Sequence, residues 1–420
     1  MLHSSFCRRL ACTQAFVLIS FLALCQVRPG IEVLEGRGFE GLVGKRVGLL
    51  TNPSGVDHNL RSTIDILNDA PEVELKALFA PEHGVRGDVY AGGTVTDNKD
   101  PKTGIRVHSL YGSHLSPSAE MLSDIDVLVY DIQDIGSRSY TFISTLGLAM
   151  RACAENDVEV MVLDRPNPLG GNKVEGCLTE PGFHSFVSEF AIPYIYGLTV
   201  GELAILLNEE GLLRGVKGDQ EPLKCRLSVI PMEGWTRDML YKDTGLPWIL
   251  PSPNIPFPQS AIDYPSSGIC GEFNNYLNIG IGYTLPFEVF AAEWIDADML
   301  KNLLDSYEIP GVVFRTVHFK PFSGSSQGKL LHGVQYHYSD YDAATCTLTQ
   351  FYVMQAVHEL YPAHDPFVTS SDRNAMFDKV CGTNYVRKTF NNRMKVEDIV
   401  GYWSKDVKDF KRLSERYWLY

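Results

Sequence analysis

The sequence predicts an α/β protein with a parallel β-sheet, followed by a smaller α+β domain. Short runs rich in Val, Ile and Leu alternate with helical patterns between residues 46 and 230, as in strands covered on both faces. The chain of 420 residues is long enough for two domains. Its character changes near residue 231, where Pro, Gly and aromatic residues become frequent. We therefore expect a Rossmann-like domain over residues 31–230 and an α+β domain over residues 231–420.

The first domain is expected to contain five strands and three helices. Each strand is a short apolar run, and the third helix begins with the spacing of a capping box, in which Thr199 and Glu202 satisfy each other's backbone N–H groups. The expected strands span residues 46–51, 75–79, 127–131, 158–163 and 227–230. The expected helices span residues 63–67, 140–155 and 199–210.

The second domain is expected to begin with loops rich in Pro over residues 231–286. A helix at 297–307, strands at 312–317 and 332–338, and a helix at 345–360 should follow. Four aromatic residues of this region are suited either to stacking on sugar rings or to ordinary core packing: Trp235, Trp248, Tyr264 and Tyr276.

The first 25 residues have the pattern of a secretory signal peptide. Arg8 and Arg9 precede an apolar run over residues 15–25, which is too short to span about 30 Å of hydrocarbon as a helix. A buried first helix is the alternative. The run ends in Leu22-Ala23-Leu24-Cys25, which resembles a lipobox except at Leu24, so a lipid on Cys25 is the one expected membrane contact. We expect export to the periplasm or the outside of the cell.

Composition excludes several classes of partner. The net charge of −14 becomes −16 without residues 1–25, which hold two Arg and no acid, and no basic patch predicts a nucleic-acid partner. The six cysteines after residue 25 lack CxxC spacing and are expected to be buried apolar residues. No Cys/His cluster predicts a metal site.

Polar residues braced by Pro or Gly follow four of the predicted strands. Because ligands of open α/β sheets bind outside the carboxyl ends of the strands, we expect a functional cleft there, although any one segment alone could be a turn or a helix cap. Their carboxylates, amides and guanidinium groups suit recognition of sugar hydroxyls and acid–base chemistry on an acetal. Motifs for dinucleotides, P-loop phosphates, zinc proteases and serine hydrolases are absent from the sequence. The four segments are residues 51–55, 80–87, 131–140 and 164–171.

These segments also carry a family resemblance. Pro81-Glu82-His83-Gly84, the blocks at 131–141, 164–176 and 197–204, and Pro251-Ser252-Pro253-Asn254 resemble the exo-β-N-acetylmuramidases of the NamZ type, long known only as a domain of unknown function (DUF1343). The resemblance covers about residues 33–420. It implies a Rossmann-like domain joined to a smaller one, with the active cleft between them. It also implies release of N-acetylmuramic acid from the non-reducing end of peptidoglycan fragments, without a metal or nucleotide cofactor.

One departure from the family pattern concerns specificity. The region reads Glu272-Phe273-Asn274-Asn275 and then Gly280-Ile281-Gly282-Tyr283, where members usually carry Glu-Gly-Thr-Asn and Gly-Arg-Gly-Thr. Ile281 therefore stands where an arginine is expected, and an arginine there would suit the lactyl carboxylate of the sugar. Arg138 and Arg165 are candidates to replace it; alternatively, they pair with Asp131 or Asp134.

Glu82 is the predicted general acid, because a partly buried carboxyl at a strand end can hold a raised pKa. The alternative is a structural cap or ion pair. The other predicted catalytic residues are His83, Asp131 and Glu272, with Asp134 and Glu175 as further candidates for the second carboxylate. Retaining (about 5 Å between carboxylates), inverting (about 6.5–9.5 Å) and substrate-assisted mechanisms all remain open. The predicted substrate-binding residues are Asn52, Arg86, Asp134, Arg138, Tyr140, Asp164, Arg165, Asn167, Glu175, Asn254 and Asn274.

Two other functions compete with this one. In a non-catalytic protein that binds cell-wall sugars, Ile281 would mark a degenerate site, but binding alone does not require so many ionisable residues. An ester hydrolase would need a nucleophile elbow or a metal cluster, and the sequence shows neither.

Overall fold

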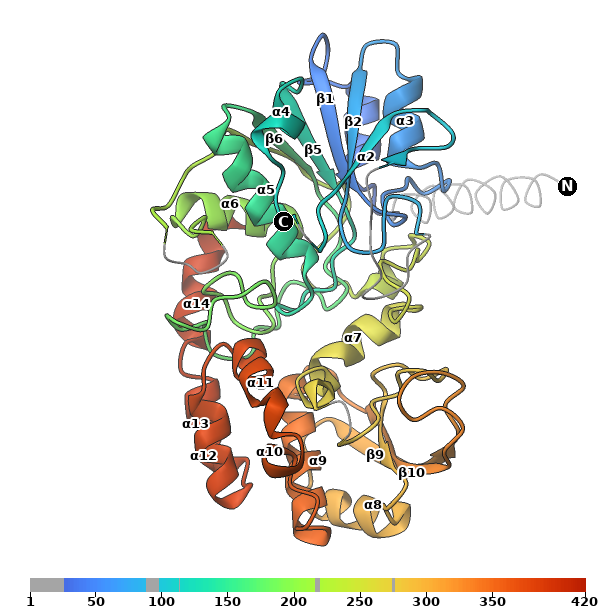
Figure 1. Ribbon diagram of the computed structural model, residues 1–420, viewed down its shortest axis with the longest axis vertical. Helices are drawn as coiled ribbons and strands as arrows, with labels where there is room; N and C mark the ends of the chain where they lie inside the picture. Colours follow the sequence, from blue (N-terminus) through green and yellow to red (C-terminus); the bar gives the residue numbers. More distant parts are fainter. Residues whose placement is uncertain (1–25, 88–97, 113, 216–219, 274–275) are drawn as a thin grey trace, which may run out of the picture.

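The computed structural model describes residues 26–87, 98–112, 114–215, 220–273 and 276–420, and it confirms the predicted fold class. Two domains lie one above the other along the long axis of the molecule, with helix α7 (Pro258–Ser267) between them (Figure 1). The predicted signal segment, including Cys25, lies outside the described residues. In the described part of the chain, no helix is long and apolar enough to cross a membrane.

The N-terminal domain is built on a sheet with the strand order β3-β4-β2-β1-β5-β6-β7. Neighbouring strands are parallel, except that β3 and β4 are antiparallel. The chain runs outward from β1 and then returns to β5, so the topological switch lies where Thr51 pairs with Asp131. The strands are β1 (Arg46–Thr51), β2 (Glu74–Ala80), β3 (Asn98–Lys99), β4 (Arg106–Ser109), β5 (Val127–Asp131), β6 (Glu159–Leu163) and β7 (Leu227–Ile230).

Both faces of this sheet are buried, because alternate side chains of each strand enter different cores. Val127 and Val129 pack with helices α2 (Gly30–Gly36) and α3 (Thr63–Asp69). Leu128 and Tyr130 pack on the opposite face with helices α5 (Phe142–Glu155) and α6 (Val200–Glu209). This two-sided burial accounts for the continuous apolar runs in the sequence. A short helix, α4 (Ala119–Leu122), precedes β5.

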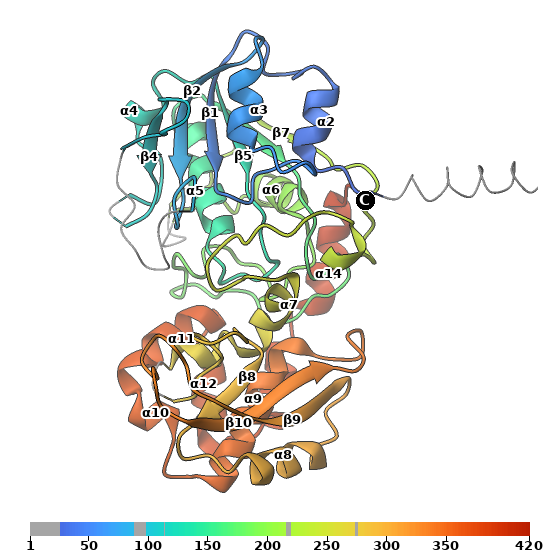
Figure 2. The same ribbon diagram turned by 90° about the vertical axis from the view of Figure 1, so that its right-hand side faces the viewer.

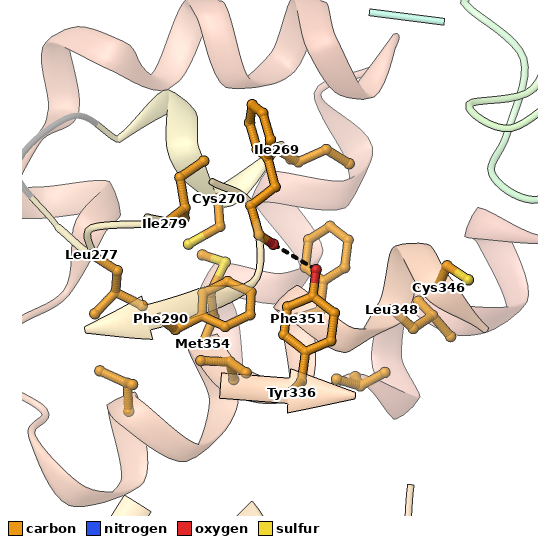
Figure 3. Close-up of a cluster of buried hydrophobic side chains, with 14 of the residues drawn as sticks. Ile269, Cys270, Leu277, Ile279, Phe290, Tyr336, Cys346, Leu348, Phe351 and Met354 are labelled. Carbon is orange, nitrogen blue, oxygen red and sulfur yellow. Dashed lines mark hydrogen bonds between the residues drawn. The ribbon is translucent and has the colours of Figure 1, made fainter. Parts of the chain in front are cut away.

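The C-terminal domain contains an antiparallel sheet in the order β8-β10-β9, formed by β8 (Val289–Ala292), β9 (Val312–Phe319) and β10 (Leu331–Tyr338). Its core gathers side chains of β8, β10 and the long helix α9, among them Phe290, Tyr336 and Phe351 (Figure 3). The Tyr336 hydroxyl donates a hydrogen bond to the carbonyl of Phe287 (2.6 Å). The helices are α8 (Ala297–Ser306), α9 (Cys346–Leu360), α10 (Pro366–Thr369), α11 (Asn374–Cys381), α12 (Tyr385–Arg393) and α13 (Glu397–Trp403).

The last helix, α14 (Val407–Ser414), returns to the N-terminal domain (Figure 2). Phe410 enters the core beneath α5 and α6, and the Tyr420 hydroxyl donates a hydrogen bond to Asp164 (2.7 Å). Residues after 230 also stay with this domain at first, since Trp235 packs with Val27. The expected boundary between the two domains lay between residues 230 and 231. In the structure, the second domain instead begins near α7 and ends before α14.

Most predicted elements of the first domain are present, with strand ends that differ by at most one residue. The capping box of α6 is confirmed by bonds from the Glu202 amide to Thr199 Oγ1 (3.2 Å) and from the Thr199 amide to Glu202 Oε2 (3.0 Å). Helix α5 begins at Phe142 rather than at residue 140. The elements that the sequence did not predict are α2, α4, α7, β3, β4, β8 and the helices after α9. The six cysteines of the described chain are buried and unpaired, as expected.

Candidate active site

The negative charges of three carboxylates from separate segments act on one phenol, Tyr264 of α7. Burial raises the pKa of Tyr264, and the negative charges of Glu272, Glu82 and Asp134 raise it further. The Tyr264 hydroxyl lies 3.0 Å from Ser139 Oγ, which also contacts the Tyr194 hydroxyl at 2.8 Å. The helix between the domains is thus fixed to the loop after β5 beside a cluster of acidic residues.

Glu82 lies half-buried just beyond the end of β2, in the loop between Pro81 and Gly84. Burial, the charge of Glu82 and a hydrogen bond to Glu82 raise the pKa of the Tyr111 hydroxyl to about 12. His83 is buried and adopts φ 77°, a left-handed conformation that is costly for a residue with a side chain. Such strain persists only where the surroundings enforce it and is common at functional sites.

Asp134 lies deeper in the same cluster. Its Oδ2 accepts hydrogen bonds from the Gly136 amide (2.8 Å) and the Tyr196 hydroxyl, whereas its Oδ1 is buried without a hydrogen-bond partner among the described residues. Burial raises the pKa of Asp134 to about 6. Asp134 is therefore a carboxyl with an uncommitted oxygen that can exchange a proton near neutral pH.

Tyr140 connects these groups. Its ring packs edge-on against Tyr264 at 5.9 Å between centroids. Burial raises the pKa of its hydroxyl, Ser252 lowers it, and the charges of Asp134 and Glu82 raise it. The pKa values of Tyr140 and Tyr264 are thus both raised by the charges of Glu82 and Asp134.

Glu272 reaches the cluster from the C-terminal domain, where it ends the short 3₁₀ helix Cys270–Glu272. It pairs with Arg373, whose Nη2 lies 2.9 Å from Glu272 Oε2 and whose Nε donates to the Glu272 carbonyl at 2.9 Å. Burial raises the pKa of Glu272, and Arg373 partly opposes that rise.

Asp131 and Arg165, two predicted site residues, form an ion pair in the interior of the N-terminal domain. Arg165 Nη2 donates to Asp131 Oδ2 at 2.9 Å, its Nε donates to Oδ1, and the Thr63 hydroxyl donates to Asp131 Oδ2. Arg165 also donates to the Val56 carbonyl (2.9 Å). These bonds fill the crevice at the topological switch, so neither side chain is presented to a ligand. The pairing of Arg165 with Asp131, left open by the sequence, is confirmed.

Arg138 corrects a second expectation, that it binds a substrate carboxylate. The residue is fully buried, and its two terminal nitrogens donate to four main-chain carbonyls at 2.6–3.1 Å. These carbonyls come from both domains: Cys177, Ile192, Val380 and Cys381. Arg138 therefore stabilises the junction of the domains rather than a ligand.

Three other predicted ligand-binding residues are buried caps. Asp164 accepts hydrogen bonds from the Thr199 hydroxyl (2.7 Å) and the Gly201 amide (2.8 Å) at the start of α6. Glu175 accepts from the amides of Cys346 (3.0 Å) and Thr347 (2.8 Å) at the start of α9. Asn167 holds its own loop, with Nδ2 donating to the Leu198 carbonyl and Oδ1 accepting from the Leu169 amide.

Asn52 and Arg86 brace the rim of the sheet. Asn52 donates to the Pro251 carbonyl (3.1 Å) and thereby joins the end of β1 to the Pro251-Ser252 segment. Arg86 donates to both carboxylate oxygens of Asp100 (2.8 and 3.1 Å). Both side chains are therefore engaged within the protein.

The remaining predicted site residues lie after residue 230. Asn254 is half-buried, and Ile281 is half-buried against the C-terminal core. Asn274 lies outside the described residues. Of the four aromatic residues, only Tyr264 joins the carboxylate cluster: Trp235 and Tyr276 are buried in cores, and Trp248 packs edge-on against Tyr241.

Of the predicted set, Glu82, Asp134, Tyr140 and Glu272 are associated with this cluster, and their roles stay predictions. Four residues outside the predicted set are associated with it as well: Tyr111, Ser139, Ser252 and Arg373. Ser139 and Ser252 belong to the quoted motifs and were within reach of prediction, whereas nothing in the sequence pattern indicated Tyr111 or Arg373. Across the described ranges, no group of three or more His, Cys, Asp or Glu residues is arranged to hold a metal ion.

Two family models match almost the whole chain. The model for the N-terminal part of the exo-β-N-acetylmuramidase NamZ matches residues 47–259, and the model for its C-terminal part matches residues 262–420. These matches identify the chain as a glycosidase. The chain belongs to the NamZ family of exo-β-N-acetylmuramidases.

Individual proteins of known sequence or structure also resemble this chain. The peptidoglycan β-N-acetylmuramidase NamZ of Bacillus subtilis is 41% identical over 94% of this chain and 92% of its own length. A DUF1343 family protein from Bacteroides fragilis, solved as a crystal structure, has a TM-score of 0.88 at 52% identity, covering 94% of this chain and 99% of that chain. A second one from the same organism has a TM-score of 0.74 at 31% identity, with the same coverage.

Proposed function

We propose that this enzyme releases N-acetylmuramic acid from the non-reducing end of peptidoglycan fragments during cell-wall turnover, with Glu82 as the general acid. The observation that supports the proposal is the polar cluster beside α7, where the Tyr264 hydroxyl lies 3.0 Å from Ser139 Oγ, the Tyr140 ring packs against Tyr264, and Asp134 Oδ1 is buried without a hydrogen-bond partner among the described residues. The charges of the Glu82 and Asp134 carboxylates act on both phenols. Hydrolysis of a glycoside requires two such carboxyl groups, or one together with the substrate's own acetamido group.

In the proposed reaction, the Glu82 carboxyl transfers its proton to the glycosidic oxygen while the bond from that oxygen to the anomeric carbon breaks. A water oxygen then bonds to the anomeric carbon, and the proton that water loses restores the acid. Asp134 is the second carboxyl, because its buried Oδ1 is without a protein partner in the described chain. His83, held in a strained turn, positions Glu82.

We also propose that the enzyme acts outside the cytoplasm, on the basis of the pattern in residues 1–25. Mass spectrometry of the mature N-terminus tests this directly. A chain that starts after the apolar run supports export, a lipid on Cys25 supports anchoring, and an intact Met1 in the native host contradicts both.

The experiment for the activity compares two substrates that differ only in the lactyl group. The full chain is incubated with a chromogenic β-N-acetylmuramide and with the matching β-N-acetylglucosaminide. We expect release from the muramide, and free N-acetylmuramic acid from the non-reducing end of a purified peptidoglycan fragment. Release from neither substrate by a folded sample would overturn the proposal in favour of a sugar-binding protein. Release from the glucosaminide alone would overturn the assigned specificity.

A further inference from the structure

Arg373 contacts one carboxylate of the cluster, Glu272, directly. It lies in the 3₁₀ helix Ser371–Arg373 of the C-terminal domain, and its side chain retains 30% of its surface exposure. Its partner Glu272 is one of the three carboxylates that act on Tyr264. The guanidinium therefore lies at the edge of the candidate site.

The bonds of Arg373 leave one side of the guanidinium uncommitted. Glu272 occupies the side formed by Nε and Nη2, through its carbonyl and Oε2, both at 2.9 Å. The opposite side, formed by Nη1 and Nη2, makes no hydrogen bond to the described residues. A carboxylate accepts two parallel N–H bonds from such a side, which is the strongest geometry available to an arginine.

The charge of the cluster makes a cation necessary for an acidic ligand. Glu272, and Glu82 and Asp134 whenever they are ionised, repel an anion, and this repulsion is weakly screened in a partly buried site. Arg138 and Arg165 do not offset this repulsion, because carbonyls and Asp131 occupy them in the interior. Arg86 is held by Asp100.

We infer that Arg373 binds the carboxylate of an acidic amino sugar through its Nη1 and Nη2 atoms, with Glu272 holding the guanidinium in place. The inference rests on the proposed function in one respect, since it identifies that carboxylate as the lactyl group of N-acetylmuramic acid. Arg373 thereby selects the muramide over the uncharged glucosaminide. It supplies the positive charge that Ile281, which stands in place of the family arginine, cannot supply.

The test compares a muramide with its lactyl methyl ester, which has the same shape and no charge. For the full-length enzyme, the ratio of kcat/KM for the acid to kcat/KM for the ester measures selectivity. In Arg373→Gln this ratio should fall by about tenfold or more, because a bidentate charged contact is lost. Arg373→Lys keeps the positive charge but loses the paired donors, so its acid-to-ester ratio should lie between those of the wild type and Arg373→Gln. Arg387→Gln is the matched control, since Arg387 forms a similar two-bond pair with Asp378, and it should keep the normal ratio.

A binding measurement separates this inference from the proposed function. Calorimetric titration with N-acetylmuramic acid and its methyl ester reports the preference for the acid without any turnover. A protein that prefers the acid through Arg373 but hydrolyses neither muramide would support the inference and overturn the proposed function. Normal hydrolysis with an unchanged ratio in a folded Arg373→Gln variant would overturn the inference alone. A protein that neither binds nor hydrolyses the acid would overturn both.

Discussion

The carboxylate of Glu175 accepts two hydrogen bonds of 2.8 Å from Thr347, one from its amide and one from its hydroxyl. Glu175 belongs to the N-terminal domain, where its backbone pairs with Ile195, and Thr347 lies in the first turn of α9 in the C-terminal domain. A side chain of one domain thus caps the longest helix of the other. Buried polar contacts therefore hold the two domains together.

Replacement of Glu175 by alanine should destabilise the enzyme rather than impair substrate binding. Buried amides at the start of α9 lose their acceptor, and the free energy of unfolding should fall by about 2–4 kcal/mol. Urea unfolding measures this loss, and the KM of the folded fraction should stay near normal. Glu233→Ala, which removes an exposed ion pair with Arg28, should cost less than about 1 kcal/mol. A stable Glu175→Ala protein with a raised KM would restore Glu175 to the binding site.

Arg138→Lys should be among the most damaging conservative changes in the chain. A lysine ammonium carries three N–H donors on one atom, so it cannot span the four carbonyls that Arg138 joins across both domains. The expected cost is about 3 kcal/mol or more, visible as a lower melting temperature and a lower yield of folded protein. Arg387→Lys, in a half-exposed pair, provides the comparison. Normal stability of Arg138→Lys, with weaker binding of the muramide, would contradict the structural role.

Asp134→Asn should change how stability depends on pH. Burial raises the pKa of Asp134 to about 6, above its usual 3.8, so the folded state favours the protonated form. The resulting stabilisation is complete below about pH 4 and is lost as the pH rises through about 6. The wild-type free energy of unfolding, minus that of Asp134→Asn, should therefore fall by roughly 3 kcal/mol between pH 4 and pH 7.

The control for this prediction is Asp164→Asn. Burial also raises the pKa of Asp164 to about 6, so its stability difference should follow the same course. Only Asp134→Asn should also lower kcat/KM, since Asp164 caps α6 beneath the surface. A pH-independent stability difference for Asp134→Asn would show that Asp134 is ionised throughout, and equal loss of activity in both variants would remove Asp134 from the reaction.

The sequence predicts the sheet well, because its central strands are buried on both faces and consist largely of apolar residues. β4 was not predicted because Arg106-Val107-His108-Ser109 is short and mixed in polarity, and its outer neighbour β3 has only two residues. Helix α7 was not predicted because it lies in a region rich in Pro. Pro258 begins the helix, and Pro265 lies within it.

The site was harder to predict, because a carboxylate at a strand end can either form a buried ion pair or stay partly accessible in its loop. Asp131 is the last residue of β5, and Glu82 lies just beyond β2. Asp131 is neutralised by Arg165, which follows the next strand and lies 34 residues along the chain. Glu82 remains half-buried in its loop. Nothing in the local sequence distinguishes the two cases. Likewise, Arg373 meets Glu272 across 101 residues, a contact that no periodic pattern encodes.

The most direct test of the account is the dependence of Glu82→Gln on the leaving group. A lost general acid matters most when the leaving oxygen is basic and least when it departs as a stable anion. The account predicts that Glu82→Gln loses about a thousandfold or more in kcat on a muramide linked to a sugar, and far less on a dinitrophenyl muramide. Glu74→Gln, at the other end of β2, is the matched control and should behave as the wild type. Equal losses on both substrates, or near-normal activity on the sugar-linked substrate, would contradict the assignment of Glu82.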